Sequence, residues 1–290
     1  LEDYRDYGIK YNYNYGLRDG EGFNMRNNYY HKPIASLNWE LKLNNKTSIS
    51  ATAYASLGRG GGSGDLGRNG SWGFFSSSRW RNPDNGYVLW DEIVKHNSGQ
   101  TANWRYGSTS MGIDASTGQY IVNDESFSSR SEYPRRNGWI QRNSVNSHNW
   151  FGAIANIQTE LAENLTLDVG FDSRFYKGLH YRNVRDLLGS DGYRDSRYNG
   201  TPNTNGVVAA TEEYKWPIGD VWNVFGDTDK EEKIDRNNNG VINYFGLYFQ
   251  LEYLMDDVSI FVQGSGSNKG YQREEFYLYG PGDPLQYSEK

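Results

Sequence analysis

The sequence predicts an all-β fold: an antiparallel transmembrane β-barrel segment with about six long strands in three hairpins and long extracellular loops. Three observations predict it. Apolar and polar residues alternate along three pairs of segments, the turn inside each pair is short, and the connections between pairs are long. The composition agrees, because 34 Gly and 24 Tyr with a mean hydropathy of -0.86 are typical of strands joined by polar loops.

The predicted hairpins lie at about 30–57, 149–175 and 243–267. The turn lengths support these hairpins. Side chains alternate between the two faces of a strand, so the number of turn residues decides whether the apolar side chains of both strands lie on the same face. Leu161 and Leu165 flank three residues, so odd positions face odd ones, and both apolar stripes are odd. Met255 and Val258 flank two residues, and the stripe switches from odd to even there. The first hairpin fits a three-residue turn, so all three patterns agree.

A membrane barrel and a soluble sandwich both have one apolar and one polar face, so the alternation alone does not distinguish them. The lengths of the connections between the hairpins favour the barrel. The expected extracellular loops are about 1–28, 58–143, 179–242 and 270–290. Loops of this length are uncommon in compact domains, whereas short turns at one end and long loops at the other are typical of outer-membrane barrels. The chain has no apolar run near the roughly 18 residues of a spanning helix, but a spanning strand needs only about 10.

Aromatic residues gather where the predicted strands meet the long loops, as in the aromatic girdle of a membrane barrel. They are Tyr29, Tyr30, Trp150, Phe151, Phe175, Tyr176, Tyr244, Phe245 and Tyr271. The net charge of -6 argues against general nucleic-acid binding. The chain has no cysteine, which rules out thiol and disulfide chemistry.

Three short segments carry a family resemblance: YYHKP (29–33), GRGGG (58–62) and YKGLHYR (176–182). Together with the strands around them, they resemble the barrel of TonB-dependent outer-membrane receptors of the type found in Bacteroidota. The resemblance covers the three hairpins, a little over half of the chain. It implies a larger closed barrel with an N-terminal plug, of which this chain is expected to be a middle portion.

The resemblance also implies a function and a location. The protein is expected in the bacterial outer membrane, taking up a scarce extracellular nutrient: a siderophore or iron complex, cobalamin, an oligosaccharide or a peptide. The implied partners are outer-membrane lipid, the rest of its own barrel and plug, the TonB complex through that plug, and a surface lipoprotein, with no nucleic acid. The alternatives are a secreted or surface β-rich glycan-binding protein and an outer-membrane barrel enzyme. We expect no enzyme, because no Ser-His-Asp spacing or H-E-x-x-H motif is present.

The long loops hold the candidate ligand-binding residues, because aromatic rings with arginines suit stacking on sugars, peptides or catecholate-like ligands. The candidates are Trp72, Trp80, Trp90, Trp104, Arg105, Tyr106, Tyr181, Arg182 and Trp216. The alternative interpretation is that these rings pack the loops against one another. The sequence leaves both open.

Two other motifs resemble parts of known binding sites. The Gly58–Gly64 run lacks the Lys and Ser or Thr of a phosphate-binding loop, so we interpret it as a strand leaving the membrane into an outer loop. Asp235, Asn237 and Asn239 match the first half of a calcium loop, but Gly246 stands where a bidentate Glu is needed. Ca²⁺ in an extracellular loop is thus the one cofactor that the sequence suggests, and no catalytic residue is assigned.

Overall fold

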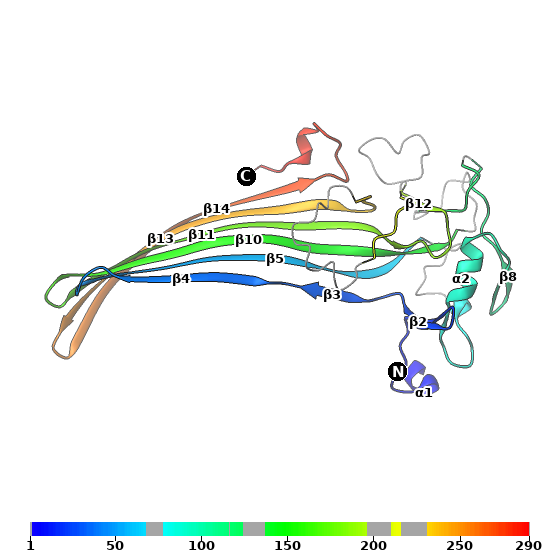
Figure 1. Cartoon of the computed structure of the whole chain (residues 1–290), viewed down its shortest axis with the longest axis horizontal. Coiled ribbons are helices and arrows are strands. Elements are labelled where there is room, and N and C mark those ends of the chain that lie inside the picture. Colours follow the sequence, from blue (N-terminus) through cyan, green and yellow to red (C-terminus); the bar gives the residue numbers. More distant parts are fainter. Residues whose placement is uncertain are drawn as a thin grey trace.

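The computed structural model describes residues 2–67, 78–115, 117–123, 137–195, 210–215 and 231–289. Its frame is one long, mostly antiparallel sheet, seen from end to end in Figure 1. The strands are β3 (Asn28–His31), β4 (Ile34–Lys42), β5 (Thr47–Gly67), β10 (Trp139–Ala162), β11 (Leu165–Asp186), β13 (Asn237–Met255) and β14 (Val258–Glu275). The all-β, antiparallel prediction is confirmed.

The sheet is open. Its order is β14-β13-β11-β10-β5, and both β3 and β4 pair with β5 at the far edge. Lys32 and Pro33 separate β3 from β4, so these two short strands act as one interrupted edge strand. A proline has no N–H to donate to a ladder and is tolerated at an edge. The predicted six long strands in three hairpins are therefore present, as an open sheet.

The predicted registers are confirmed. Leu41 pairs with Ile49, and Phe151 with Phe175, odd against odd. In the third hairpin Met255 pairs with Val258, odd against even. One detail differs: a bulge shifts the register between Glu160 and Ala162, so Ala162 pairs with Leu165 and the turn shrinks to Glu163-Asn164. Asn164 takes a positive φ of 70°, which asparagine tolerates better than most residues.

The strands run further than the predicted hairpins. β5 is 21 residues long and continues through the whole Gly58–Gly64 run to Gly67, while β10 has 24 residues and begins at Trp139. The interpretation of the glycine run as the start of a loop is therefore wrong. The glycines make room for rings from neighbouring strands: a Cβ on Gly58 would lie 2.2 Å from Cε1 of His148, and one on Gly60 would lie 2.1 Å from Cδ2 of Tyr30.

Replacing Gly58 with alanine tests this close approach. The new Cβ would overlap the imidazole of His148, whose Nε2 lies 3.2 Å from Oγ of the buried Ser56, so the ring has to move and lose that contact. We expect a loss of about 1–3 kcal/mol in the free energy of unfolding, measured by denaturant titration of the purified protein. Gly266→Ala in β14 is the matched control, because nothing lies within 4 Å of its added Cβ. Equal effects of the two variants would contradict the steric explanation.

The two ends of the sheet differ. The three hairpin turns gather at one end, and the smaller elements lie at the other, which we call the loop end (Figure 1). These elements are α1 (Glu2–Tyr7), β1 (Tyr15–Arg18), β2 (Glu21–Asn24), η2 (Ser78–Trp80), β6 (Val88–Leu89), α2 (Trp90–Asn97), β7 (Ala102–Trp104), β8 (Gly107–Thr109), β9 (Ile121–Asn123) and β12 (Gly192–Arg194). A short η5 (Pro284–Gln286) follows β14. None of the described helices is long and apolar enough to cross a membrane.

The two faces of the sheet also differ. On one face apolar side chains stand side by side across β4, β5, β10, β11, β13 and β14, and we call this surface the apolar band. It comprises Leu37, Trp39, Leu41, Ile49, Ala51, Ala53, Phe151, Ala155, Ile157, Leu167, Val169, Phe171, Phe175, Phe245, Leu247, Phe249, Leu251, Ile260 and Val262. Leu37, Leu247 and Val262 keep 72%, 53% and 62% of their surface exposed, so no described segment covers the band there.

The apolar band gives way to a mixed row on the side of the loop end. The preceding row contains Phe151 and Phe175. The mixed row of the same face adds the polar Asn149, Lys177 and Gln272 to the apolar Leu57 and Val241, and the Nζ of Lys177 forms an ion pair with Glu274 at 3.0 Å. In β11 the band runs from Leu167 to Phe175, close to the about 9–11 residues that cross a bilayer as a tilted strand. The opposite face, the polar face, carries side chains such as Glu40, Gln158, Asp168, Arg174 and Gln250.

Candidate functional site

The buried core lies at the loop end, where strands meet the smaller elements. One cluster contains Met25, Trp80, Val88, Trp90, Ile93, Ala102, Trp139 and Leu188. A second contains Met111, Val122, Ile140, Val184, Leu187, Tyr193, Ala210 and Ile234. The smaller elements are therefore a folded layer on the ends of β10 and β11, and they share a hydrophobic core with those strand ends.

Aromatic rings hold the first cluster together. The ring of Trp80 meets that of Trp139 edge to face, with centroids 5.6 Å apart, and stacks on Trp104 at 6.0 Å. Trp90 packs edge to face on Phe23 at 4.8 Å, and its indole N–H donates to the Phe23 carbonyl. Such pairs add about 0.5–1.5 kcal/mol each beyond their burial. The aromatic rings of the loops thus stabilise the packing of this part of the chain.

This placement revises the predicted ligand-binding set. Trp80, Trp90 and Tyr181 are only 2%, 0% and 3% exposed, so they have almost no surface for a ligand and belong to the packed interior. The physical reason is that large rings contribute most when they leave water entirely. For these three, burial favours the packing interpretation: Trp80 and Trp90 belong to the first cluster, and Tyr181 lies within β11.

The other predicted ligand residues are accessible or not described. Tyr106 is 65% exposed, and Arg105 is exposed with its guanidinium 5.7 Å from that ring. Trp104 and Arg182 are half-buried. Trp72 and Trp216 lie outside the described residues. A ligand role for the accessible residues stays a prediction.

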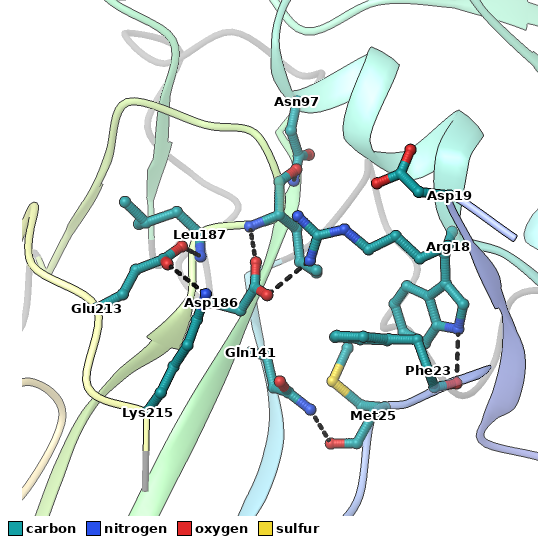
Figure 2. Close-up of polar contacts among 12 residues, drawn as sticks. Arg18, Asp19, Phe23, Met25, Asn97, Gln141, Asp186, Leu187, Glu213 and Lys215 are labelled. Atoms are coloured by element: carbon teal, nitrogen blue, oxygen red, sulfur yellow. Dashed lines mark hydrogen bonds and ion pairs between the residues drawn. The ribbon is translucent and has the colours of Figure 1, made fainter. Parts of the chain in front are cut away.

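Polar contacts fasten the smaller elements to the strand ends (Figure 2). Arg18 of β1 reaches Asp186 at the end of β11, with Nη1 and Oδ2 2.6 Å apart. The same carboxylate accepts the backbone N–H of Leu188 at 2.9 Å. On β10, the Gln141 amide donates to the Met25 carbonyl at 2.8 Å. Because Asp186 and Gln141 are nearly fully buried, these bonds satisfy groups that would be costly to leave unpaired.

Helix α2 joins this network through one buried amide. The Asn97 Nδ2 donates to the carbonyls of Trp139 and Leu188 at 2.7 and 2.9 Å. It therefore bridges the start of β10 and the turn after β11. Since Asn97 is fully buried, the helix is held in one position against both strands.

A carboxylate with altered acidity lies beside the end of β11. The Asn183 amide donates to Glu231 at 2.7 Å. Burial raises the pKa of Glu231, and the neighbouring Tyr181 and Asn183 side chains oppose that rise only in part. Nearby, burial raises the pKa of Tyr214 to about 12. The Tyr214 hydroxyl donates a hydrogen bond to Glu212 at 2.8 Å.

The residues of the predicted calcium loop lie at the start of β13. Asn237 and Asn239 are paired in the ladder with β11, so they belong to a strand and not to a loop. Asp235 forms an ion pair with Arg182, and the Asn239 amide donates to Glu274 at 2.8 Å. Among the described residues, no group of three or more His, Asp or Glu is arranged to hold a metal ion.

A hollow on the polar face was not predicted as a site. Its volume is about 540 Å³, within the range of about 300–1,000 Å³ typical of small-molecule pockets. We call it the basic–aromatic groove; it is lined by Tyr30, Lys32, His148, Trp150, Arg174, Tyr176, Ile242, Tyr244 and Lys269. The groove residues of β10, β11 and β13 all have even numbers, so they lie on one face of the sheet. The sequence predicts that they meet only once the register between the hairpins is known.

The register brings the long side chains of the groove together from neighbouring strands. One ladder row contains Gly152, Arg174, Tyr244 and Lys269 in neighbouring strands. Its glycine carries no side chain, and the ring of Tyr54 lies over that position: a Cβ there would be 2.2 Å from Cζ of the tyrosine. The ring of Tyr54 thus occupies the space over Gly152, and the three long side chains of the row line the groove beside it.

Cations lie over several rings of the groove. The Nζ of Lys32 is 5.4 Å from the ring centre of Trp150, and the guanidinium of Arg174 is 5.4 Å from that of Tyr244. Arg174 also forms a two-point ion pair with Asp172, at 2.6 and 3.2 Å. His148 stacks on Tyr176 with centroids 5.8 Å apart. This arrangement can bind an anion and a ring at the same time.

Comparison with known proteins adds no relative: no family model matches the chain, and no curated protein matches it. The function is therefore inferred from the apolar band, the loop end and the polar face.

Proposed function

We propose that this chain forms part of the wall of an outer-membrane β-barrel of the TonB-dependent receptor type, which takes up a scarce extracellular nutrient. The observation that carries the proposal is the apolar band. Exposed apolar surface is unfavourable in water, and contiguous exposed patches of this kind mark an interaction surface. Lipid is the covering that suits a band crossing six adjacent strands.

The dimensions of the band support lipid as its covering. It spans about as many residues per strand as a bilayer-crossing strand requires. Toward the loop end it meets the mixed row in which Asn149, Lys177 and Gln272 first bring polar and charged groups between the apolar positions, and Lys177 forms an ion pair with Glu274. Charged groups belong in water or in the headgroup region, because the hydrocarbon interior penalises them. This change of chemistry within two ladder rows fits the outer boundary of a membrane.

The arrangement of the ends supports an orientation. Short turns lie at one end and the folded loop end at the other (Figure 1), as in outer-membrane barrels with periplasmic turns and long extracellular loops. We assign the loop end to the outside of the cell. There its exposed residues, Arg105 and Tyr106 among them, meet the nutrient or a surface lipoprotein.

A soluble β-sandwich accounts less well for the same surfaces. It would bury its apolar face under a second layer, and in the described part of the chain the band is largely exposed. The open edges at β14 and at β3 with β4 are also unsuited to a bilayer unless other strands pair with them. The proposal therefore includes the remaining strands of the barrel, a plug and, through the plug, the TonB complex.

Fractionation of cells that produce the full-length gene product tests the membrane assignment. We expect the protein in the outer-membrane fraction, released by detergent and not by high salt or alkaline washing. Purified protein that stays monodisperse in plain buffer would overturn the assignment and favour the secreted glycan-binding alternative. Uptake is tested separately: loss of the gene, or loss of TonB, should abolish accumulation of the same nutrient.

A further inference from the structure

The basic–aromatic groove has a charge that contrasts with the rest of the chain. The protein has a net charge of -6, yet the groove is lined by Lys32, Arg174 and Lys269 and by no acidic side chain. Asp172, beside the groove, offsets one of these charges through its ion pair with Arg174. Lys32 and Lys269 are exposed, and neither forms an ion pair with another described residue.

The two lysines are held in place by rings rather than by carboxylates. Lys32 lies over Trp150, and Lys269 over Tyr271, with its Nζ 4.8 Å from the ring centre. A cation–π contact restricts an ammonium group but leaves N–H donors free. Such donors bind carboxylates through charge-assisted hydrogen bonds, which are stronger than neutral ones. The groove thus offers preplaced donors for an anionic group.

The aromatic walls of the groove also restrict the kind of ligand that fits. Trp150, Tyr176 and Tyr244 are half-buried and present apolar ring surface beside the cations, while Tyr30 is 63% exposed at the rim. A small inorganic anion would leave this surface in water. A ring-shaped body carrying the anion would cover it and gain from the contact.

We propose that the basic–aromatic groove binds a small organic acid, a carboxylate carried on a ring. The inference rests on the proposed function, because the groove lies on the polar face, which faces the water-filled interior in a membrane barrel. It deepens that function by naming the chemistry of a ligand on the transport route. Two sources share this chemistry, an acidic sugar and an aromatic acid.

Calorimetric titration of the detergent-purified full-length protein tests the proposal with two matched pairs of probes. Glucuronate is compared with glucose, and benzoate with benzyl alcohol. We expect at least one acid to bind at least tenfold more tightly than its neutral partner, and to bind more weakly as salt increases. The pair that responds identifies the ring as a saccharide or as an aromatic.

Substitutions assign the binding to the groove. Lys32→Gln and Lys269→Gln should each weaken the acid by about tenfold, the effect of losing one charge-assisted hydrogen bond. Lys42→Gln is the matched control, since Lys42 lies on the polar face close to the turn end of β4 and should leave binding unchanged. Circular dichroism of each variant verifies that the sheet is intact.

Three outcomes would overturn the inference. Neither acid binds, as would happen if another segment of the protein fills the groove; the neutral partners bind as tightly as the acids; or Lys42→Gln weakens binding as much as the groove variants. Each is distinguishable from failure of the proposed function, because membrane location is measured by fractionation and not by titration.

Discussion

Replacing Trp90 with alanine should lower the free energy of unfolding by about 3–5 kcal/mol, the typical cost of removing a large buried ring. Trp90 is completely buried in the first loop-end cluster. The substitution leaves a cavity, removes the ring contact with Phe23 and leaves the Phe23 carbonyl without its indole donor. Denaturant titration followed by far-UV circular dichroism measures the loss.

Tyr106→Ala is the control for this loss. It also removes an aromatic ring from a loop, but that ring is 65% exposed, so the change should stay within about 0.5 kcal/mol. Limited proteolysis should then cut the loop end of the Trp90 variant faster while the sheet persists. If the two variants unfold alike, the loop end has no cooperative core of its own.

Replacing Phe249 with arginine should destabilise the protein in a membrane by about 2–4 kcal/mol, the cost of an arginine near the middle of the bilayer. Phe249 stands in the centre of the apolar band, in a ladder row with Val169 and Gly264. In water the same substitution would cost much less, because 47% of the side chain is already exposed. The amount of folded protein in the outer-membrane fraction, and its unfolding in lipid vesicles, give the measurement.

Gln250→Arg is the matched control, because it introduces the same charge one residue further along β13. Successive residues of a strand point to opposite faces, so this arginine lies on the polar face and should change stability by less than about 1 kcal/mol. A difference between the two variants supports lipid on the face of Phe249. Equal and small effects would show that both faces of the sheet meet water.

The registers were predictable because alternation with a period of two leaves little freedom. Moving a strand by one residue would transfer every apolar side chain to the other face, so the loop lengths at Leu161 and Met255 sufficed to pair the strands. The bulge before Leu165 was not predictable, because it shifts one residue at the turn and leaves the apolar stripe in place.

Strand ends and exposure were not predictable from local sequence. The Gly58–Gly64 run has low strand propensity, and it forms a strand because rings from His148 and Tyr30 occupy the space above it. Burial of Trp80 and Trp90 likewise depends on partners far along the chain. The basic–aromatic groove combines residues from five strands or strand ends, so no single stretch of sequence contains its pattern.

The contrast between short turns and long connections has a consequence for the order of folding. Each hairpin closes locally, on a timescale of about 1–10 μs, so β10 with β11 and β13 with β14 can form before the hairpins meet. Joining β5 to β10 then closes a much longer loop. That closure is inexpensive in entropy, since each doubling of loop length adds only roughly 0.6 kcal/mol. Insertions in the long connections should therefore have only small effects on the stability of the sheet and on the rate at which it assembles.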